Sequence, residues 1–198
     1  MKLWLNLLCQ LLLRGIRFGQ FMLFYFCVIH FRAIRMLFRP PITGDTNWCS
    51  TPLIVANRMF NHPLLGSNWG LVDVGCGEGL LGVFIRLVKG RPVQLVDTQP
   101  VFLRMITRCC RWLLISGVRV GDHIQFHGCH QPVVFCSWES WSKSNRRATL
   151  NKISAATPPG GLLITIGHRV TDNAWVHMDQ RTETFAWGKS WVYYYKHA

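Results

Sequence analysis

A glycine-rich loop between a predicted strand and a predicted helix carries the clearest chemical signal in this sequence. Residues 71–74 form a short apolar run around Asp73, which is typical of a buried strand in a parallel sheet. Glycine occupies three of the next five positions, 75–79, and residues 80–88 are predicted to form a helix. Glycine lets the main chain turn sharply and lets a ligand approach the backbone closely. We therefore expect a ligand to bind against this loop and the first N–H groups of the helix.

A second acidic residue is placed where it could complete a nucleotide site. The next predicted strand, residues 93–96, ends in Asp97, which lies 24 positions after Asp73. An acid at the tip of the second strand can accept hydrogen bonds from both hydroxyls of a ribose, as it does in dinucleotide-binding folds. An ordinary tight turn explains the glycines alone, but it does not explain the strand, the helix and the spaced acid together.

The segment Val-Asp-Val-Gly-Cys-Gly-Glu-Gly at 72–79 resembles the first motif of the class I S-adenosylmethionine-dependent methyltransferases. The resemblance covers about residues 69–195 and includes a Pro-Gly-Gly turn at 159–161, before the predicted fifth strand. It implies a three-layer, Rossmann-like α/β domain with a mostly parallel sheet and an antiparallel edge pair. It also implies S-adenosylmethionine as the cofactor, with its ribose bound by Asp97. The residues that would surround its methionine part are Asp73, Gly75, Cys76, Gly77 and Gly79.

A nicotinamide- or flavin-binding Rossmann domain is the main alternative. Residues 77–82 fit G-x-G-x-x-G, and Asp97 lies 20 residues after Gly77. In that alignment Gly75 would fall within the strand, and Asp73 would place a carboxylate close to a bound pyrophosphate. Both consequences favour the methyltransferase interpretation.

Two other signatures of the family are missing. We predict the third strand at residues 123–127, and the family often has an acid directly after this strand to bind the adenine amino group. Gly128-Cys129-His130 follows instead, so the sequence assigns no adenine contact. After the fourth strand, predicted at 133–136, the Asn/Asp-Pro-Pro-aromatic motif of enzymes that methylate amino groups is absent. Ser137 stands where the 2′-O RNA enzymes have aspartate. The sequence therefore gives less support to both substrate classes, amino groups and the 2′-O position of RNA.

The catalytic candidates follow the fourth strand, beyond whose carboxyl end substrate and methyl group would meet. Glu139 is the best general base by position, and Ser137 is the second candidate. Glu139 could instead be an acid at a helix start, where it would complement the helix dipole. Trp138 and Trp141 could stack on a flat substrate or pack in the core. Catalysis would rest mainly on proximity and alignment, because the sulfonium of the cofactor is already activated.

Histidines and cysteines do not form a recognisable metal site, and we predict none. Two histidines four residues apart on a strand lie about 13 Å apart, too far to share one ion. The region also lacks a short-spaced ligand pair. The eight cysteines include no CxxC pair, which favours reduced thiols in a cytosol-like compartment. The residues that invite a zinc hypothesis are His123, His127, Cys129, His130 and Cys136.

The first 41 residues form a separate segment, predicted to be an apolar, basic helical arm, and residues 42–198 form the methyltransferase domain. Residues 1–39 contain six basic residues and no acidic one, and a proline pair then ends the arm. Two apolar blocks, residues 3–13 and 18–31, are each shorter than the ~20 residues that span a bilayer.

Three placements of the arm are open. It could lie in the interface of an anionic membrane through residues 1–39, with arginine heads that reach the lipid phosphates. It could pack on the domain or on a second subunit. A tilted transmembrane span is the poorest alternative, because Arg14 and Arg17 separate the apolar blocks and would enter the bilayer.

The net charge of the chain indicates which kinds of partner it can bind. The formal net charge of +13 favours an anionic partner, either nucleic acid or an anionic membrane surface, and the charged share of only 16% argues against disorder. We expect S-adenosylmethionine-dependent methyl transfer to an unidentified acceptor, a hydrophobic or membrane-associated molecule, on the cytoplasmic side of a membrane. The alternative is a basic RNA-binding or scaffold protein that retains the cofactor fold. Acceptor and oligomeric state are not encoded in any motif found.

Overall fold

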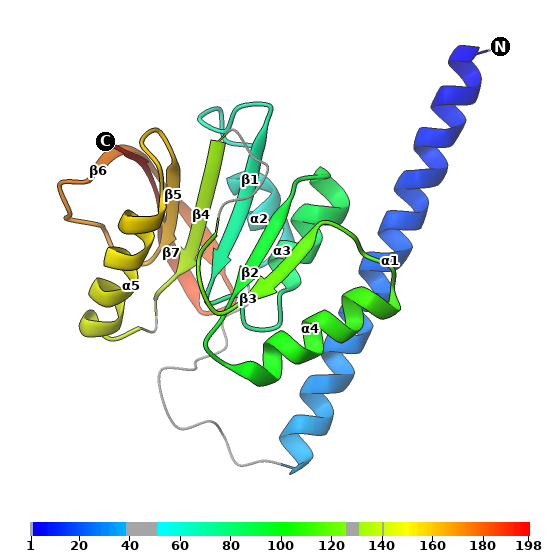
Figure 1. Cartoon of the computed structure of the whole chain (residues 1–198), viewed down its shortest axis with the longest axis horizontal. Helices are drawn as coiled ribbons and strands as arrows, with labels where there is room; N and C mark the ends of the chain where they lie inside the picture. The colour runs from blue at the N-terminus through cyan, green and yellow to red at the C-terminus, as the bar shows by residue number, and fades with distance from the viewer. Residues whose placement is uncertain (1, 39–50, 126–130, 140) are drawn as a thin grey trace.

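The fold is built around a seven-stranded sheet (Figure 1). The computed structural model describes residues 2–38, 51–125, 131–139 and 141–198, with side chains in the first helix described for residues 12–30. The strands are β1 (Trp69–Val74), β2 (Val93–Val96), β3 (Val118–Gly121), β4 (Gln131–Ser137), β5 (Leu162–Ile166), β6 (Trp175–Phe185) and β7 (Gly188–His197). Their order is β3-β2-β1-β4-β5-β7-β6. Strands β1 to β5 are parallel, and β7 is antiparallel to both β5 and β6. The predicted sheet with its antiparallel edge pair is confirmed.

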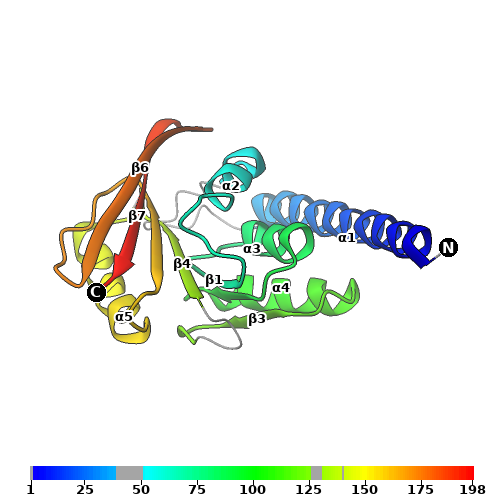
Figure 2. The same ribbon diagram turned by 90° about the horizontal axis from the view of Figure 1, so that it is seen from above.

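Helices cover both faces of this sheet. On one face lie α2 (Leu53–Met59), α3 (Leu80–Phe84), its π-helical continuation η1 (Ile85–Lys89) and α4 (Pro100–Trp112), whereas α5 (Lys143–Ala156) lies on the other (Figure 2). The long helix α1 (Lys2–Phe38) packs outside α3, η1 and α4. The predicted three-layer architecture with a helical arm before it is confirmed.

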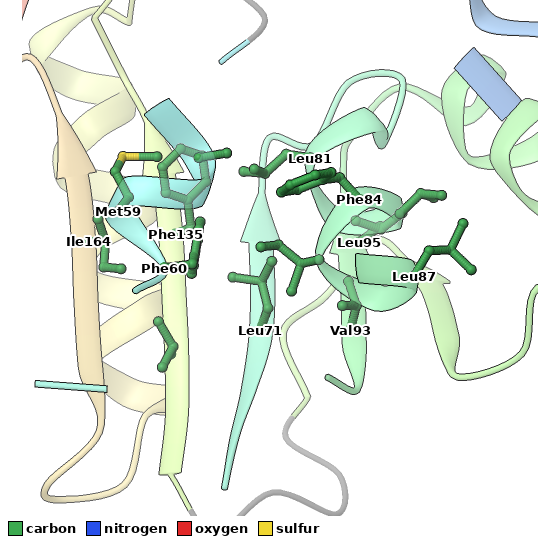
Figure 3. Packing of buried hydrophobic residues seen from close by; sticks show 14 of the residues in the cluster. Met59, Phe60, Leu71, Leu81, Phe84, Leu87, Val93, Leu95, Phe135 and Ile164 are labelled. Carbon is green, nitrogen blue, oxygen red and sulfur yellow. The ribbon is translucent and has the colours of Figure 1, made fainter. Parts of the chain in front are cut away.

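The core explains why the central strands are mainly apolar along their length. Successive side chains of a strand point to opposite faces. Leu71, Phe135 and Ile164 pack toward α2 and α3 (Figure 3), and their neighbours Val72 and Leu163 pack on the face that α5 covers. Because both faces are covered, most positions of these strands are apolar, and Asp73, Gln94 and Thr165 are buried polar exceptions.

The third strand lies earlier than the sequence predicts. The prediction at residues 123–127 is wrong, since β3 is Val118–Gly121 and pairs with β2. Gln94, a buried residue of β2, donates from Nε2 to the carbonyl of His123 (2.7 Å) and accepts at Oε1 from the N–H of Gln125 (2.8 Å). These bonds fix the backbone after β3 by side-chain contacts instead of by a strand ladder. The rest of the predicted strand lies outside the described residues.

The closing hairpin of β6 and β7 is tied to α2. Arg58 forms an ion pair with Glu183 of β6 (2.7 Å). Just after α2, the buried Nε2 of His62 hydrogen-bonds Oδ2 of Asp179, also in β6 (2.7 Å). The hairpin therefore belongs to the same packed unit as the parallel sheet.

α1 is one continuous helix that packs on the domain along one side. Phe21, Phe24 and Val28 are buried against the domain core, and they recur at spacings of three and four residues, which places them on one helix face. Nε2 of Gln20 donates to the carbonyl of Leu113, just after α4 (2.8 Å). Packing on the domain, one of the three placements considered for the arm, is what this part of the helix shows.

The remaining surface of α1 is exposed. Among the described residues, the stretch Leu12–His30 is long and apolar enough to cross a membrane, judged by length and composition alone. Phe18 is 62% exposed and Phe26 is 59% exposed. The helix does not break at Arg14 or Arg17, although these residues divide the sequence into two apolar blocks.

α4 ends in a left-handed turn that leaves a leucine in solvent. The N–H of Ile115 donates to the carbonyl of Cys110 (2.8 Å) and the N–H of Leu114 to that of Arg111 (3.3 Å), which is the pattern of a Schellman motif. Leu114 has φ of +53°, where glycine is usual, and this conformation costs a residue with a Cβ roughly 1 kcal/mol. Its side chain is 84% exposed, so packing does not offset that cost.

Candidate functional site

The glycine loop closes over the end of β2. The N–H groups of Gly75 and Cys76 both donate to the carbonyl of Val96 (2.8 and 3.1 Å), and the N–H of Gly79 donates to the carbonyl of Cys76 (2.9 Å). The φ angles are +75° at Gly75, +53° at Gly77 and +73° at Gly79, a region that residues with a Cβ rarely adopt. The spacing of the glycines is therefore required by the shape of the turn itself.

Asp97 is fixed against the same loop. Its Oδ2 accepts from the N–H of Gly77 (2.9 Å), and its Oδ1 accepts from the N–H of Gln99 (2.8 Å). Burial raises the pKa of this carboxyl, and the backbone hydrogen bonds act in the opposite direction. Each carboxylate oxygen has a second lone pair, so Asp97 can still accept hydrogen bonds from ligand hydroxyls.

Asp73 is the buried acid of the site. It lies in β1, directly before the end of the strand, and its side chain is only 3% exposed. Burial, with a further contribution from the charge of Asp97, raises its pKa to about 7. A positive ligand group beside it would favour the ionised form. The same burial, together with both carboxylates, raises the pKa of the Cys76 thiol well above its ordinary value, so Cys76 is a neutral wall residue and no nucleophile.

The two tryptophans after β4 have different places. Trp138 is buried at 2% exposure, and its Nε1 donates to the carbonyl of His168 (3.2 Å), so it is a core residue that anchors the loop after β5. Trp141 is half-buried and lies against the glycine loop. A Cβ built on Gly75 would come within 2.7 Å of its Cζ2. Of the two, only Trp141 borders the site.

Ser137 and Glu139 lie at the carboxyl ends of the central strands. Ser137 is the last residue of β4. The half-buried Glu139 accepts a hydrogen bond at Oε2 from the Ser190 hydroxyl (2.7 Å), and its carboxylate occupies the space where a Cβ on Gly167 would stand. Glu139 does not start a helix, because α5 begins at Lys143. The helix-dipole alternative for Glu139 is therefore wrong.

Asp122 is a candidate that sequence reasoning missed. It directly follows β3 once the strand is placed at Val118–Gly121. Its exposed carboxylate pairs with Nδ1 of His123 (2.7 Å), and this hydrogen bond lowers its pKa. The acid expected after the third strand is thus present. The signal was the sequence Val-Gly-Asp at 120–122, hidden by the misplaced strand.

Of the residues considered for zinc, only His123 and Cys136 lie in the described part of the chain. His123 pairs with Asp122, and Cys136 is fully buried within β4. His127, Cys129 and His130 lie outside the described residues. Within the described part of the chain, no three His, Cys, Asp or Glu side chains are placed to hold a metal ion.

The contact between Trp141 and the loop predicts unequal effects of two alanine substitutions. Gly75→Ala combines a left-handed conformation with a clash against the indole and should lower the free energy of unfolding by about 3 kcal/mol. Gly77→Ala is the matched control, because its Cβ would meet nothing within 4 Å, and it should cost only about 1 kcal/mol. Urea denaturation measures both. Removing the indole in Gly75→Ala/Trp141→Ala should recover most of the difference, and equal losses for the two single variants would refute this packing.

Comparisons with known proteins give structural matches only. No protein-family model matches this sequence, and neither does any curated protein. The structure is similar to TrmN from Thermus thermophilus, with a TM-score of 0.57 and 12% identity over 80% of this chain and 51% of TrmN. This chain thus spans about half of that protein.

Two further similar structures are closer in length to this chain. An RNA methyltransferase from Salinibacter ruber, in complex with S-adenosyl-L-homocysteine, matches with a TM-score of 0.51 and 16% identity over 74% of this chain and 92% of that one. Precorrin-6y C5,15-methyltransferase from Geobacter metallireducens matches with a TM-score of 0.53 and 9% identity over 77% and 93%. The strand order and these matches agree: the chain has the Rossmann-like fold of the class I methyltransferases.

Proposed function

We propose that this protein transfers a methyl group from S-adenosylmethionine to an acceptor. The observation that supports this best is the hydrogen bond between Gly77 and Asp97, which joins a left-handed glycine loop to the acid at the end of β2. The buried Asp73 lies beside them, at the carboxyl edge of a sheet with the methyltransferase strand order. Fold similarity alone would not support an activity, whereas this arrangement supplies groups that match the cofactor.

The residues present fit the cofactor. A Cβ on Gly77 would meet nothing within 4 Å, so the space in front of the loop is open to a ligand. Asp97 would accept the ribose hydroxyls through its free lone pairs, and Asp73 would lie near the cationic methionine part. Asp122 would accept from the adenine amino group.

Other residues would act on the acceptor. S-adenosylmethionine supplies a methyl group on a sulfonium that needs no further activation. The chain must therefore align the acceptor and exclude water. Glu139, oriented by Ser190, would take a proton from the attacking atom, and Ser137 would position it. Trp141 would form the wall between the glycine loop and the acceptor.

We propose a hydrophobic or membrane-associated molecule as the acceptor. The support is the exposed apolar surface of α1, which packs on the helices that follow β1 and β2. RNA is the second candidate. Exposed Lys143 and Arg147 at the start of α5, close to Trp141, would suit a phosphate backbone, and an RNA methyltransferase is among the similar structures.

Calorimetric titration of S-adenosylmethionine and S-adenosylhomocysteine into the folded protein tests the cofactor. We expect micromolar binding of both and none of NADH. Asp97→Ala should weaken binding roughly 100-fold, because two charge-assisted hydrogen bonds are lost, and Asp122→Ala should weaken both ligands about equally, since they share the adenine. Asp172→Ala is the charge-matched control, because Asp172 precedes β6 at the opposite edge of the sheet. Failure of the wild type to bind either ligand would reject the proposed cofactor.

Binding should also depend on pH through Asp73. The free protein holds a proton on this carboxyl up to a pKa of about 7, whereas a cationic ligand favours the carboxylate. Affinity for S-adenosylmethionine should therefore be roughly eightfold weaker at pH 6 than at pH 7.5. Asp73→Asn should bind more weakly and lose this dependence. Because the folded pKa is raised, Asp73 also makes the wild-type fold less stable as pH rises from about 4 through 7, and the variant should lack that slope as well.

The acceptor can be identified by class. S-adenosylmethionine tritiated in its methyl group is incubated with the protein and either a lipid extract or total RNA, with Asp97→Ala as the control for background. Label in the organic phase would support the hydrophobic acceptor. Label incorporated into RNA when the reaction is run at moderate salt would support the second candidate and overturn the first.

A further inference from the structure

We propose that the outward side of α1 and the end of α4 form one surface that docks the protein, with α1 parallel to the membrane plane, on an anionic lipid bilayer. We call this surface the docking face. It consists of the exposed apolar side chains of α1 together with Trp112 and Leu114. Those of α1 that matter most here are Leu12, Ile16, Phe18, Met22, Leu23 and Phe26. This inference goes beyond the proposed activity and does not depend on it.

The two sides of α1 differ in a way that packing on the domain does not explain. Phe21, Phe24 and Val28 face the domain. Arg14 precedes Phe21 by seven residues and Arg17 precedes Phe24 by seven, which is about two turns, so both arginines lie on the domain side. A Cβ on Gly90 of the domain would come within 3.9 Å of the Arg17 guanidinium. Within residues 12–30, the opposite side is mainly apolar and carries no Lys, Arg, Asp or Glu.

The end of α4 extends this apolar surface. The hydrogen bond from Gln20 to the carbonyl of Leu113 places the turn after α4 beside α1. On either side of Leu113, Trp112 is 87% exposed and Leu114 is 84% exposed. Leu114 keeps a strained left-handed backbone while its side chain contributes nothing to the core. Tryptophan and leucine exposed next to an apolar helix are typical of a membrane interface.

Charge around the docking face matches an anionic surface. α4 contains three arginines, and α1, α3, η1 and α4 contain no acidic residue. Arg104, Arg108 and Arg111 of α4 recur on one face and are exposed. Basic residues that flank an apolar face attract the phosphates of anionic lipids.

The contacts of α1 favour an in-plane helix over a span. The domain covers Phe21, Phe24 and Val28 in the middle of Leu12–His30. A spanning helix would have to lose these contacts or draw α3 and α4 into the hydrocarbon. A helix in the plane keeps them and buries only the opposite side. A second copy is a poorer occupant, because two such faces would bring like charges together.

The position of the docking face relates it to the candidate site. Figure 1 shows that α1 crosses the domain and extends past the end of the molecule toward which β1 and β4 point. The glycine loop and Glu139 lie at that end. A bilayer that follows α1 along its length would therefore reach from the end of α4, at the amino ends of the strands, toward the end of the molecule that holds the glycine loop.

Vesicle flotation with the full-length protein tests this inference. The probes are vesicles of phosphatidylcholine alone and of phosphatidylcholine with phosphatidylserine. We expect binding to both and tighter binding to the anionic vesicles. Phe18→Asp/Phe26→Asp should lower the partition coefficient at least about tenfold. Ile54→Asp is the matched control, because Ile54 of α2 is 67% exposed but lies outside the docking face, and its binding should not change.

Two more variants separate the contributions. Arg104→Gln and Arg108→Gln should each reduce binding to anionic vesicles about fivefold and leave binding to phosphatidylcholine unchanged. Leu114→Gly relieves the left-handed strain, so its Tm should rise while its vesicle binding falls. Because this variant should be more stable than the wild type, misfolding could not explain its weaker vesicle binding.

Four outcomes would overturn the inference. The first is unchanged vesicle binding by Phe18→Asp/Phe26→Asp, which would mean charge attraction alone. The second is resistance of membrane-bound protein to alkaline carbonate extraction, which would indicate a span. The third is a lipid-free dimer by light scattering that Phe26→Asp dissociates, which would assign the face to a second copy. The fourth is a larger loss of vesicle binding in Ile54→Asp than in the docking-face variants.

Discussion

The structure depends most on holding two carboxylates at neighbouring strand ends. Asp73 in β1 and Asp97 after β2 lie near one loop, because the loop's first two N–H groups bond the carbonyl of Val96. Burial and the charge of Asp97 raise the pKa of Asp73 to about 7, which corresponds to roughly 4 kcal/mol against its ionised form. Two main-chain N–H groups stabilise Asp97. A cationic ligand would stabilise the ionised form of Asp73 in the same way. The buried carboxyl that is costly to ionise in the ligand-free protein therefore favours binding of the proposed cofactor.

The parts of the fold that follow from local sequence could be predicted. Residues 93–96 form an apolar run interrupted only by Gln94 and bounded by turns, and β2 has these bounds in the structure. The third strand could not be placed, because the position of residues 123–125 depends on the side chain of Gln94, about thirty positions earlier in the chain. Apolar residues in this segment imitated a strand. That error also concealed Asp122, since the acid is recognisable only by its place at a strand end.

The cofactor side of the candidate site is local in sequence and the acceptor side is not. Three glycines and two acids within 25 residues define the loop, so their types and spacing could be read directly. Glu139 takes its position from Ser190, which lies 51 residues away, and Trp141 takes its position from Gly75. Trp138, its near neighbour, points into the core. Side chains so close in sequence differ in role because tertiary contacts orient them, and no residue pattern records those contacts.

The composition of α1 predicts an apolar, basic helix correctly but does not determine how that helix is placed against the domain or a membrane. Its sequence is apolar and basic throughout, which suits a membrane surface, a domain contact or a subunit interface equally well. The contacts of Phe21, Phe24 and Val28 divide it into two sides, and the division assigns Arg14 and Arg17 to the side that faces the domain. The arginines therefore need not enter the bilayer for the opposite side to do so. The cost of buried charge, which argues against a span, does not argue against a helix that lies in the plane.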